Sequence, residues 1–424
     1  MTAPSKAVVI GDIEVARRTC SALLERGYKV EHLLQPTDAE LREALTPEVA
    51  AVAVLIRGDV IALRYALLVE HLKPQVRLVV TLFDRTVAEQ LIKAVPNCQV
   101  TSPADISVPS IIGGCLGDSI LAVEVSAAGA IAIVSDGDDA RSEVWHNTRS
   151  RFRQFLSAVA GQARAHDEST RLLFIGLAGL VTTLFLDWFL ATTALHEKGI
   201  RALYIAARIV ATVGPGDADL HAPSWYLVLA SVFMLATIVF TAMFTAGVVN
   251  RALSSRSIGI VGARTIPTRD HVAVVGLGPV GLRLCTQLRQ LGIKVIAVER
   301  DPRAVNLRLA KAAQVPVLIA HAEDRAVLKR LSLHRARALA AMGADDLDNI
   351  EVAIAALAVA PDVRIVLRAG EDDVIAETRS LFTIGQVRDV SALTAFAVTA
   401  SLAGEAVQTV YLRGNHVAAR CACG

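Results

Sequence analysis

Two long apolar stretches in the middle of the chain limit what it can fold into. Residues 172–194 (LLFIGLAGLVTTLFLDWFLATTA) contain one charged residue, Asp187, and residues 225–249 (WYLVLASVFMLATIVFTAMFTAGVV) contain none. Each stretch exceeds the roughly 20 residues that a helix needs to cross a bilayer. The sequence therefore predicts two membrane spans rather than two buried core helices.

Basic residues beside the two spans set the expected orientation. The segment between them, 196–224, has three basic residues. The outer flanks carry more, namely Arg151, Arg153, Arg164 and Arg171 before the first span and Arg251, Arg256, Arg264 and Arg269 after the second. Because basic flanks stay on the cytoplasmic side, we predict that both termini are cytoplasmic. The start of the chain lacks the pattern of a cleaved signal peptide.

Short apolar runs alternate with helical stretches on both sides of the spans. Such alternation is typical of a parallel sheet covered by helices. We predict an α/β chain with two Rossmann-like parallel-sheet domains that flank a two-helix transmembrane module. The expected parts are a first α/β domain (1–120), a linker with a basic juxtamembrane helix (121–171), the membrane module (172–250), a second linker (251–270) and a second α/β domain (271–424).

The two α/β regions read as copies of one unit. KAVVIG (6–11) aligns with HVAVVG (271–276) at an offset of 265, whereas VRLVV (76–80) aligns with VRIVL (363–367) at an offset of 287. The second copy therefore holds 22 extra residues between these two blocks. Internal repetition of this kind predicts two domains of the same topology.

Charge and cysteine content exclude some classes of protein. A net charge of +2, from 43 basic and 41 acidic residues, argues against a nucleic-acid-binding polycation, so no nucleic-acid partner is expected. The six cysteines include no CxxC pair, which predicts reduced thiols and no metal site.

The second copy carries a glycine pattern that is typical of dinucleotide-binding loops. A predicted strand, 272–275, leads into Gly276, Leu277, Gly278, Pro279, Val280 and Gly281 and then into a helix. In this pattern the glycines permit a tight turn, close approach of a pyrophosphate and close helix packing. The next strand ends in Glu299, whose carboxylate suits ribose hydroxyls and repels a 2′-phosphate, although Arg300 beside it weakens that preference. The alternative is a glycine turn that serves packing alone.

The first copy lacks most of this pattern. The positions that match Gly276, Gly278, Gly281 and Glu299 are, in the same order, Gly11, Ile13, Ala16 and Leu34. A branched side chain at the second position obstructs phosphate, and leucine cannot bind ribose. We predict that the first copy has kept the fold and lost the ligand.

No catalytic constellation is evident, so no enzymatic activity is expected. His321, Glu323 and Asp324 follow the third strand of the second copy and are candidates for the wall of the nucleotide pocket. A single histidine at a strand end is more often structural. The chain has no Ser/His/Asp pattern, metalloprotease helix or Walker A loop.

The segment between the spans, 199–220, has the pattern of a re-entrant loop. Residues 200–211 suit a short helix, and an extended, glycine-containing stretch follows it. Non-helical backbone at membrane depth is tolerated only inside protein or beside water. Backbone carbonyls there can replace the hydration shell of an ion. The predicted ion filter consists of Thr212, Val213, Gly214, Pro215, Gly216 and Asp217.

TVGPGD between two spans resembles the selectivity filter of tetrameric potassium channels. The second copy, with GLGPVGLRL and VIAVERDP, is similar to the regulator-of-potassium-conductance (RCK, TrkA-N) domain. The resemblance implies a homotetramer in a prokaryotic cell (inner) membrane, with K⁺ as permeant ion and a cytosolic gating ring. The glycine loop favours NAD(H) or an adenine nucleotide as the ligand of the second copy, and the resemblance leaves divalent cations and cyclic dinucleotides open as well.

The chain departs from the family pattern at three positions near the filter. Pro215 replaces the usual aromatic residue, Ala211 replaces a threonine, and Arg208 stands where relatives carry an acidic or apolar residue. We hypothesise that Arg208 pairs with Asp217. These departures keep open the alternative of a non-conducting membrane sensor of channel ancestry. The glycine loop with Glu299 keeps open a second alternative, a membrane-anchored NAD-dependent oxidoreductase.

Overall fold

The computed structural model divides the chain into two compact units. One comprises Met1–Ser150 with Ile260–Gly424, and the other comprises Arg151–Gly259. The structure describes residues 5–126, 129–137, 139–146, 168–194, 196, 199–211, 223–254, 260–261, 267–370, 384–414 and 416–421.

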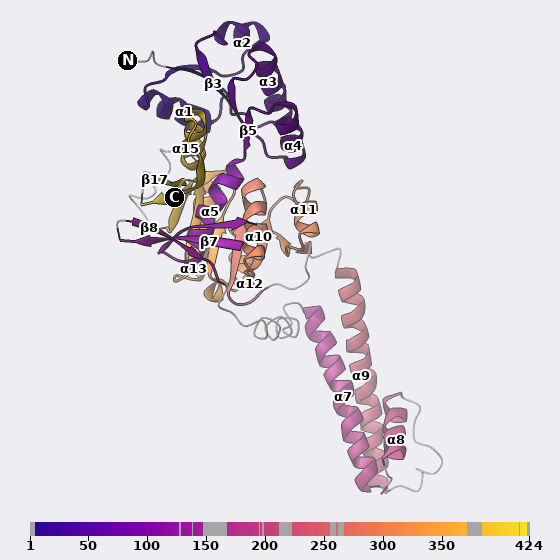
Figure 1. Cartoon of the computed structure of the whole chain (residues 1–424). Helices are drawn as coiled ribbons and strands as arrows, with labels where there is room; N and C mark the ends of the chain where they lie inside the picture. The colour runs from indigo at the N-terminus through magenta and orange to yellow at the C-terminus, as the bar shows by residue number, and fades with distance from the viewer. Residues whose placement is uncertain are drawn as a thin grey trace. The chain divides into compact units, whose positions relative to one another are not determined.

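The first α/β domain is built on a five-stranded parallel sheet of order β2-β1-β3-β4-β5 (Figure 1). Its strands are β1 (Lys6–Ile10), β2 (Lys29–Leu33), β3 (Val49–Val54), β4 (Arg77–Thr81) and β5 (Cys98–Thr101). Its helices are α1 (Glu14–Glu25), α2 (Asp38–Ala44), α3 (Asp59–Leu72), α4 (Arg85–Ala94) and α5 (Pro103–Leu116). The central strands are apolar on both faces because helices cover both faces.

The second α/β domain has a seven-stranded sheet of order β15-β14-β13-β10-β11-β12-β9, in which only β9 is antiparallel among the described strands. Its strands are β9 (Ile260–Val261), β10 (His271–Val275), β11 (Lys294–Glu299), β12 (Val317–Ile319), β13 (Ala338–Ala341), β14 (Ile365–Ala369) and β15 (Gln386–Asp389). Its helices are α10 (Pro279–Gln290), α11 (Leu307–Ala312), α12 (Arg325–Arg330), the short 3₁₀ helix η2 (Leu333–Arg335), α13 (Asp346–Val359) and α15 (Val390–Ala403).

The predicted repeat is present in the structure down to the strand register. Lys6 pairs with Lys29 in the first sheet, and His271 pairs with Lys294 in the second, which preserves the offset of 265. The first sheet passes from β2 through α2 to β3, whereas the second inserts β12 and α12 before β13. This extra strand–helix unit accounts for the added residues of the second copy.

The last helix of each copy packs against the sheet of the other copy. Val108 and Ile111 of α5 share a buried cluster with Val274 and Val366 of the second sheet. In return, α15 places Ala395, Val398 and Leu402 in a cluster with strands β1, β3 and β4 of the first sheet. Both helices are apolar around most of their circumference, as expected for helices that are covered on every side.

Two small antiparallel sheets follow the exchanged helices. One comprises β6 (Ile120–Ser126), β7 (Gly129–Asp136) and β8 (Asp139–Val144), and the other comprises β16 (Val407–Arg413) and β17 (His416–Cys421). Tyr411 of β16 packs with Leu121 and Ile133 of the first small sheet. The segment 121–171, expected to be linker and juxtamembrane helix, thus begins with three strands. The buried residues of the small sheet lie on β6 and β7, whereas β8 is exposed along its length.

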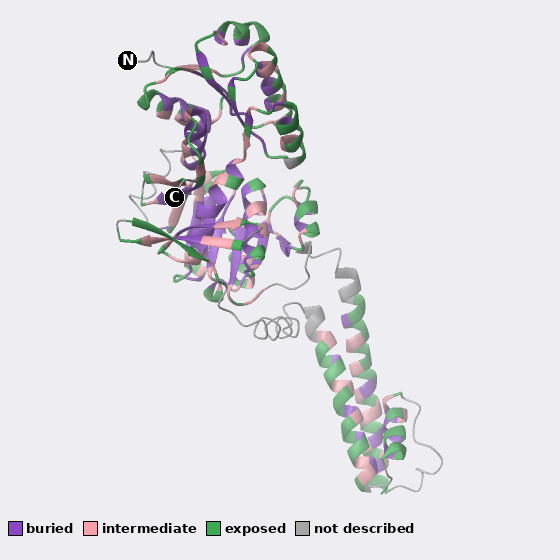
Figure 2. Ribbon diagram, viewed as in Figure 1, coloured by how far each residue is buried: buried purple, intermediate pink, exposed green. Residues whose placement is uncertain are grey.

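The described residues of the second unit form three helices. These are α7 (Glu168–Ala194), α8 (Ile200–Val210) and α9 (Ser224–Ser254). Stretches of α7 and α9, Leu172–Thr193 and Ser224–Val249, are long and apolar enough to cross a membrane. Many large apolar residues on both helices are exposed. Figure 2 colours the exposed residues of the two helices green. Lipid would cover such a surface, and water would not.

Glycines let α7 and α9 approach each other closely. A Cβ atom added to Gly176 would lie 2.5 Å from the backbone nitrogen of Phe244, and one added to Gly179 would lie 2.3 Å from the ring of Phe240. Small residues at helix contacts are typical of packing in membranes, where apolar burial against lipid gives little driving force.

Candidate nucleotide site and membrane module

The glycine loop of the second copy forms a tight turn between β10 and α10. Gly276 has a φ of +88°, which favours glycine, and its N–H donates to the carbonyl of Val298 at 2.9 Å. A Cβ atom on Gly281 would lie 2.0 Å from the carbonyl oxygen of Gly276. The first and third glycines therefore have the backbone roles that the sequence predicted for them.

The space above the middle glycine is open. An added Cβ atom on Gly278 would meet no heavy atom within 4 Å. Gly278 is the N-cap of α10 and Pro279 is its first residue, so the backbone N–H groups of Val280 and Gly281 lie in the first turn. The first N–H groups of a helix have no partner inside the helix, and the helix dipole favours an anion there. This geometry suits a phosphate or pyrophosphate.

Glu299 is held against the glycine loop. Its Oε2 accepts a hydrogen bond from the N–H of Leu277 at 2.8 Å, and its Oε1 accepts one from the N–H of Asp301 at 3.0 Å. The carboxylate thus lies at the end of β11 beside the loop, where a ribose of a bound nucleotide would be expected.

Asn306 also contacts the loop, and the sequence analysis did not identify it. Its Nδ2 donates to the carbonyl of Leu277 at 2.9 Å. The residue lies in the turn that precedes α11, so no periodic pattern marks it. Asn306 and Glu299 together hold the backbone carbonyl and the backbone N–H of Leu277 in place.

Arg300 forms an ion pair across the sheet edge. Its NH1 lies 2.9 Å from Oδ2 of Asp348 in the first turn of α13. Both side chains are largely exposed, so the pair contributes at most about 1 kcal/mol. The pair nevertheless gives Arg300 an acidic neighbour that competes with any ligand phosphate.

The matching loop of the first copy lacks the open middle glycine, and Ile13 there packs against the buried cluster that α15 shares with the first sheet. Gly11 has a φ of +143°, and a Cβ atom there would lie 1.9 Å from the carbonyl oxygen of Leu55. Ile13 occupies the N-cap of α1, and Leu34 is exposed. The ring Nε2 of His32 lies 2.7 Å from the carbonyl oxygen of Gly11. A branched side chain therefore stands where the second copy has an open glycine.

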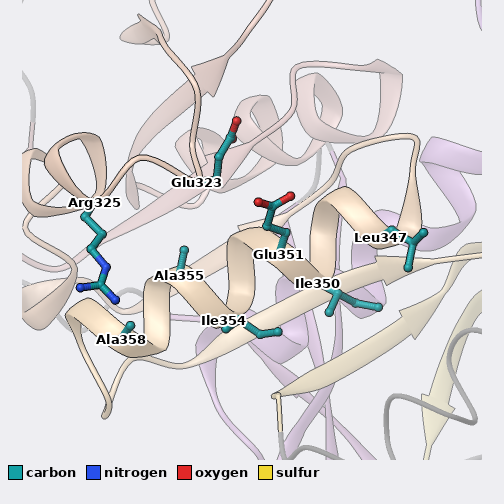
Figure 3. A pocket seen from close by; sticks show the side chains of 8 residues that line it. All are labelled: Glu323, Arg325, Leu347, Ile350, Glu351, Ile354, Ala355 and Ala358. Atoms are coloured by element: carbon teal, nitrogen blue, oxygen red, sulfur yellow. The ribbon is translucent and has the colours of Figure 1, made fainter.

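His321 and Glu323 follow β12, and the N–H of Ala320 beside them donates to the backbone carbonyl of Glu299 at 3.0 Å. The ring Nδ1 of His321 is 3.1 Å from Oε1 of Glu323, and the histidine side chain is exposed. Glu323 and Arg325 border a groove of 370 Å³ along α13, shown in Figure 3. The other residues of its lining are Leu347, Ile350, Glu351, Ile354, Ala355 and Ala358. None of them belongs to the glycine loop.

Metal-binding groups are absent from the described part of the chain. No cluster of three or more His, Cys, Asp or Glu side chains suited to a metal ion occurs among those residues.

In the membrane unit, α8 is the short helix that the sequence predicted between the spans. Its residues Ile205 and Ile209 pack with Ala191 of α7 and Tyr226 of α9. The guanidinium of Arg208 lies 5.8 Å from the centre of the Tyr204 ring. The predicted filter, Thr212 to Asp217, and with it the Arg208–Asp217 pair, lies outside the described residues.

A family comparison assigns the domain that carries the glycine loop. Residues 272–384 match the family model of the TrkA-N domain. The second α/β domain is a TrkA-N domain. The match includes the glycine loop, Glu299 and the groove along α13.

Curated potassium channels are similar to this chain in sequence. It is 27% identical over 226 residues to the voltage-gated potassium channel Kch of Escherichia coli (strain K12), which covers 51% of this chain and 51% of Kch. It is 19% identical over 209 residues to potassium channel protein 1 of Methanocaldococcus jannaschii, covering 48% of this chain and 62% of that protein. The chain thus spans about half to three fifths of the length of these channels.

Solved structures are similar in fold to most of the chain. The GsuK RCK domain covers 95% of this chain and 77% of its own length, with a TM-score of 0.52 and 13% identity. The GsuK channel bound to NAD covers 95% of this chain and 64% of its own length, with a TM-score of 0.50 and 14% identity. At this level of identity the likeness establishes a common fold.

Proposed function

We propose that this chain is a subunit of a ligand-gated, K⁺-conducting channel. The main support is one combination of features. Two apolar helices enclose a short helix and the sequence TVGPGD, and a TrkA-N domain follows them along the chain. Four copies would surround one pore, with Thr212 to Asp217 as the ion filter. Relatives named as potassium channels support the same assignment.

The ligand of the second α/β domain is proposed to be NAD(H) or an adenine nucleotide. The pyrophosphate would lie at the open N-terminus of α10, above Gly278. Glu299 would accept hydrogen bonds from ribose hydroxyls, and its charge would oppose a 2′-phosphate. A channel of similar fold has been solved with NAD bound, which supports this ligand class.

Coupling of the ligand to the pore would pass through the exchanged helices. Helix α10 begins at the glycine loop and packs against α5 of the first copy, which leads along the chain into β6–β8 and the first span. A ligand shifts such an equilibrium only if it binds one state more tightly than the other. The first copy would then act as a transmitter that binds no nucleotide itself.

Ion flux tests the proposal. Purified full-length protein in liposomes is expected to pass K⁺ in a manner that depends on NADH or ATP. The variant Gly214→Ala is expected to abolish selective flux, because the added methyl group opposes the backbone geometry of a filter. A well-folded tetramer without flux under either ligand would favour the non-conducting sensor. Oxidation of NADH by the protein would favour the oxidoreductase.

A further inference from the structure

Asp187 is a buried carboxylate inside the membrane unit. Thr183, Asp187 and Ala191 follow one another at four-residue spacing on α7, and all three are buried, with Asp187 only 1% exposed. Neither carboxylate oxygen has a hydrogen-bond partner among the described residues. A charge in this position is costly, and intramembrane acids usually pair with another group.

Arg208 of α8 lies about as many helical turns from the connection between α7 and α8 as Asp187 does. A short connection joins α7 to α8, so the two packed helices run in opposite directions. Asp187 precedes the end of α7 by about two turns, and Arg208 follows the start of α8 by about two turns. The flanking residues agree with this placement, because Leu190 and Ala191 pack with Ile205 and Ile209.

Each of the two charged groups lacks an ionic partner in the described structure. The guanidinium of Arg208 contacts the face of the Tyr204 ring. This cation–π contact offsets only part of the guanidinium charge. An unpaired arginine beside an ion path would repel K⁺, and an unpaired carboxylate at membrane depth would destabilise the helix pair.

We infer that Asp187 is the counter-ion of Arg208 in the assembled channel. A change of the arginine side-chain rotamer, from the Tyr204 ring toward α7, lets guanidinium N–H groups donate to the carboxylate. Asp187 is then a positioning residue: it holds Arg208 behind the pore wall and cancels its charge. This inference rests on the proposed channel function, and it assigns Arg208 a different partner from Asp217.

A double-mutant cycle on the full-length protein tests the pair. Asp187→Asn and Arg208→Gln are each expected to lower K⁺ flux in liposomes at least tenfold and to lower the melting temperature of the tetramer in detergent. The double variant is expected to recover most of both losses, because it removes both buried charges together.

Matched controls separate the possible outcomes. Arg201→Gln removes a second arginine from α8 and is expected to show no coupling to Asp187→Asn. Additive effects of Asp187→Asn and Arg208→Gln would overturn the inference, as would recovery by Asp217→Asn in place of Asp187→Asn. Absence of flux from the unmodified protein would refute the channel function instead, and the melting temperatures would still decide whether the two residues pair.

Discussion

NH2 of Arg283 on α10 lies 2.6 Å from Oδ1 of Asp105 on α5. The pair joins the helix that begins at the glycine loop to the helix that the first copy places on the second sheet. A movement of α10 on ligand binding would therefore act directly on the first copy.

Loss of this ion pair should weaken the response to ligand. We expect Asp105→Asn to raise the NADH or ATP concentration for half-maximal flux about two- to fivefold. The half-exposed pair contributes no more than about 1 kcal/mol, so the fold should persist. The control is Asp38→Asn, which breaks a pair with Arg64 inside the first copy. Equal shifts for both variants would argue against transmission through α5.

Alanine substitutions at Gly281 and Gly278 of the glycine loop should have opposite effects: the first should lower stability and the second should lower nucleotide affinity. Gly281→Ala should destabilise the second domain by about 1–3 kcal/mol, because its Cβ would meet the carbonyl of Gly276. Gly278→Ala should leave the melting temperature unchanged, since nothing lies within 4 Å, yet lower nucleotide affinity on the order of tenfold. Calorimetric binding and thermal unfolding separate the two effects. Unchanged affinity for Gly278→Ala would place the phosphate elsewhere.

Glu299 should set the preference for an unphosphorylated ribose. Glu299→Gln keeps an acceptor for the N–H of Leu277 but removes the charge, so we expect NADH affinity to fall about tenfold and NADPH affinity to rise. Asp348→Asn should raise NADPH affinity a few-fold by releasing Arg300. Titration of both cofactors checks these shifts. As a control, Glu323→Gln in the groove along α13 should change neither affinity.

His271 should make the second domain less stable in acid. Burial lowers its pKa from 6.5 to about 4, and Lys294 nearby acts in the same direction. Between these two values the unfolded chain takes up a proton that the folded domain excludes, so stability falls as the pH drops. The loss should reach about 2 kcal/mol at pH 5. Thermal unfolding at pH 7 and pH 5 should show a smaller loss for His271→Gln than for the exposed control His71→Gln.

Close packing of α7 on α9 should make Gly176 intolerant of substitution. The Cβ atom of Gly176→Ala would lie 2.5 Å from the backbone nitrogen of Phe244, which cannot move independently of α9. We expect a melting temperature several degrees lower for the protein in detergent. Leu177→Ala, on the exposed side of α7, is the control and should have little effect. Equal losses would indicate that the two helices do not meet at Gly176.

Much of the local structure was predictable because it depends on near neighbours in the chain. The two membrane-length helices, the short helix between them and most strands of the two parallel sheets follow from apolar runs and their lengths. The glycine loop was predictable because Gly276 and Gly281 are needed for one backbone turn. Asn306 was missed because its role is a single contact with Leu277, 29 positions earlier in the chain.

Local patterns in the chain specify two α/β copies, two membrane-length helices and the copy that has an open glycine loop. The tertiary structure decided which sheet each terminal helix covers. Helices α5 and α15 are apolar around most of their circumference. That pattern indicates that each helix is buried, but not which sheet covers it. Either sheet offers a similar apolar face, so the exchange depends on long-range fits such as Arg18 with Asp389 and Arg283 with Asp105. Such pairings join residues far apart in sequence, and no local pattern encodes them.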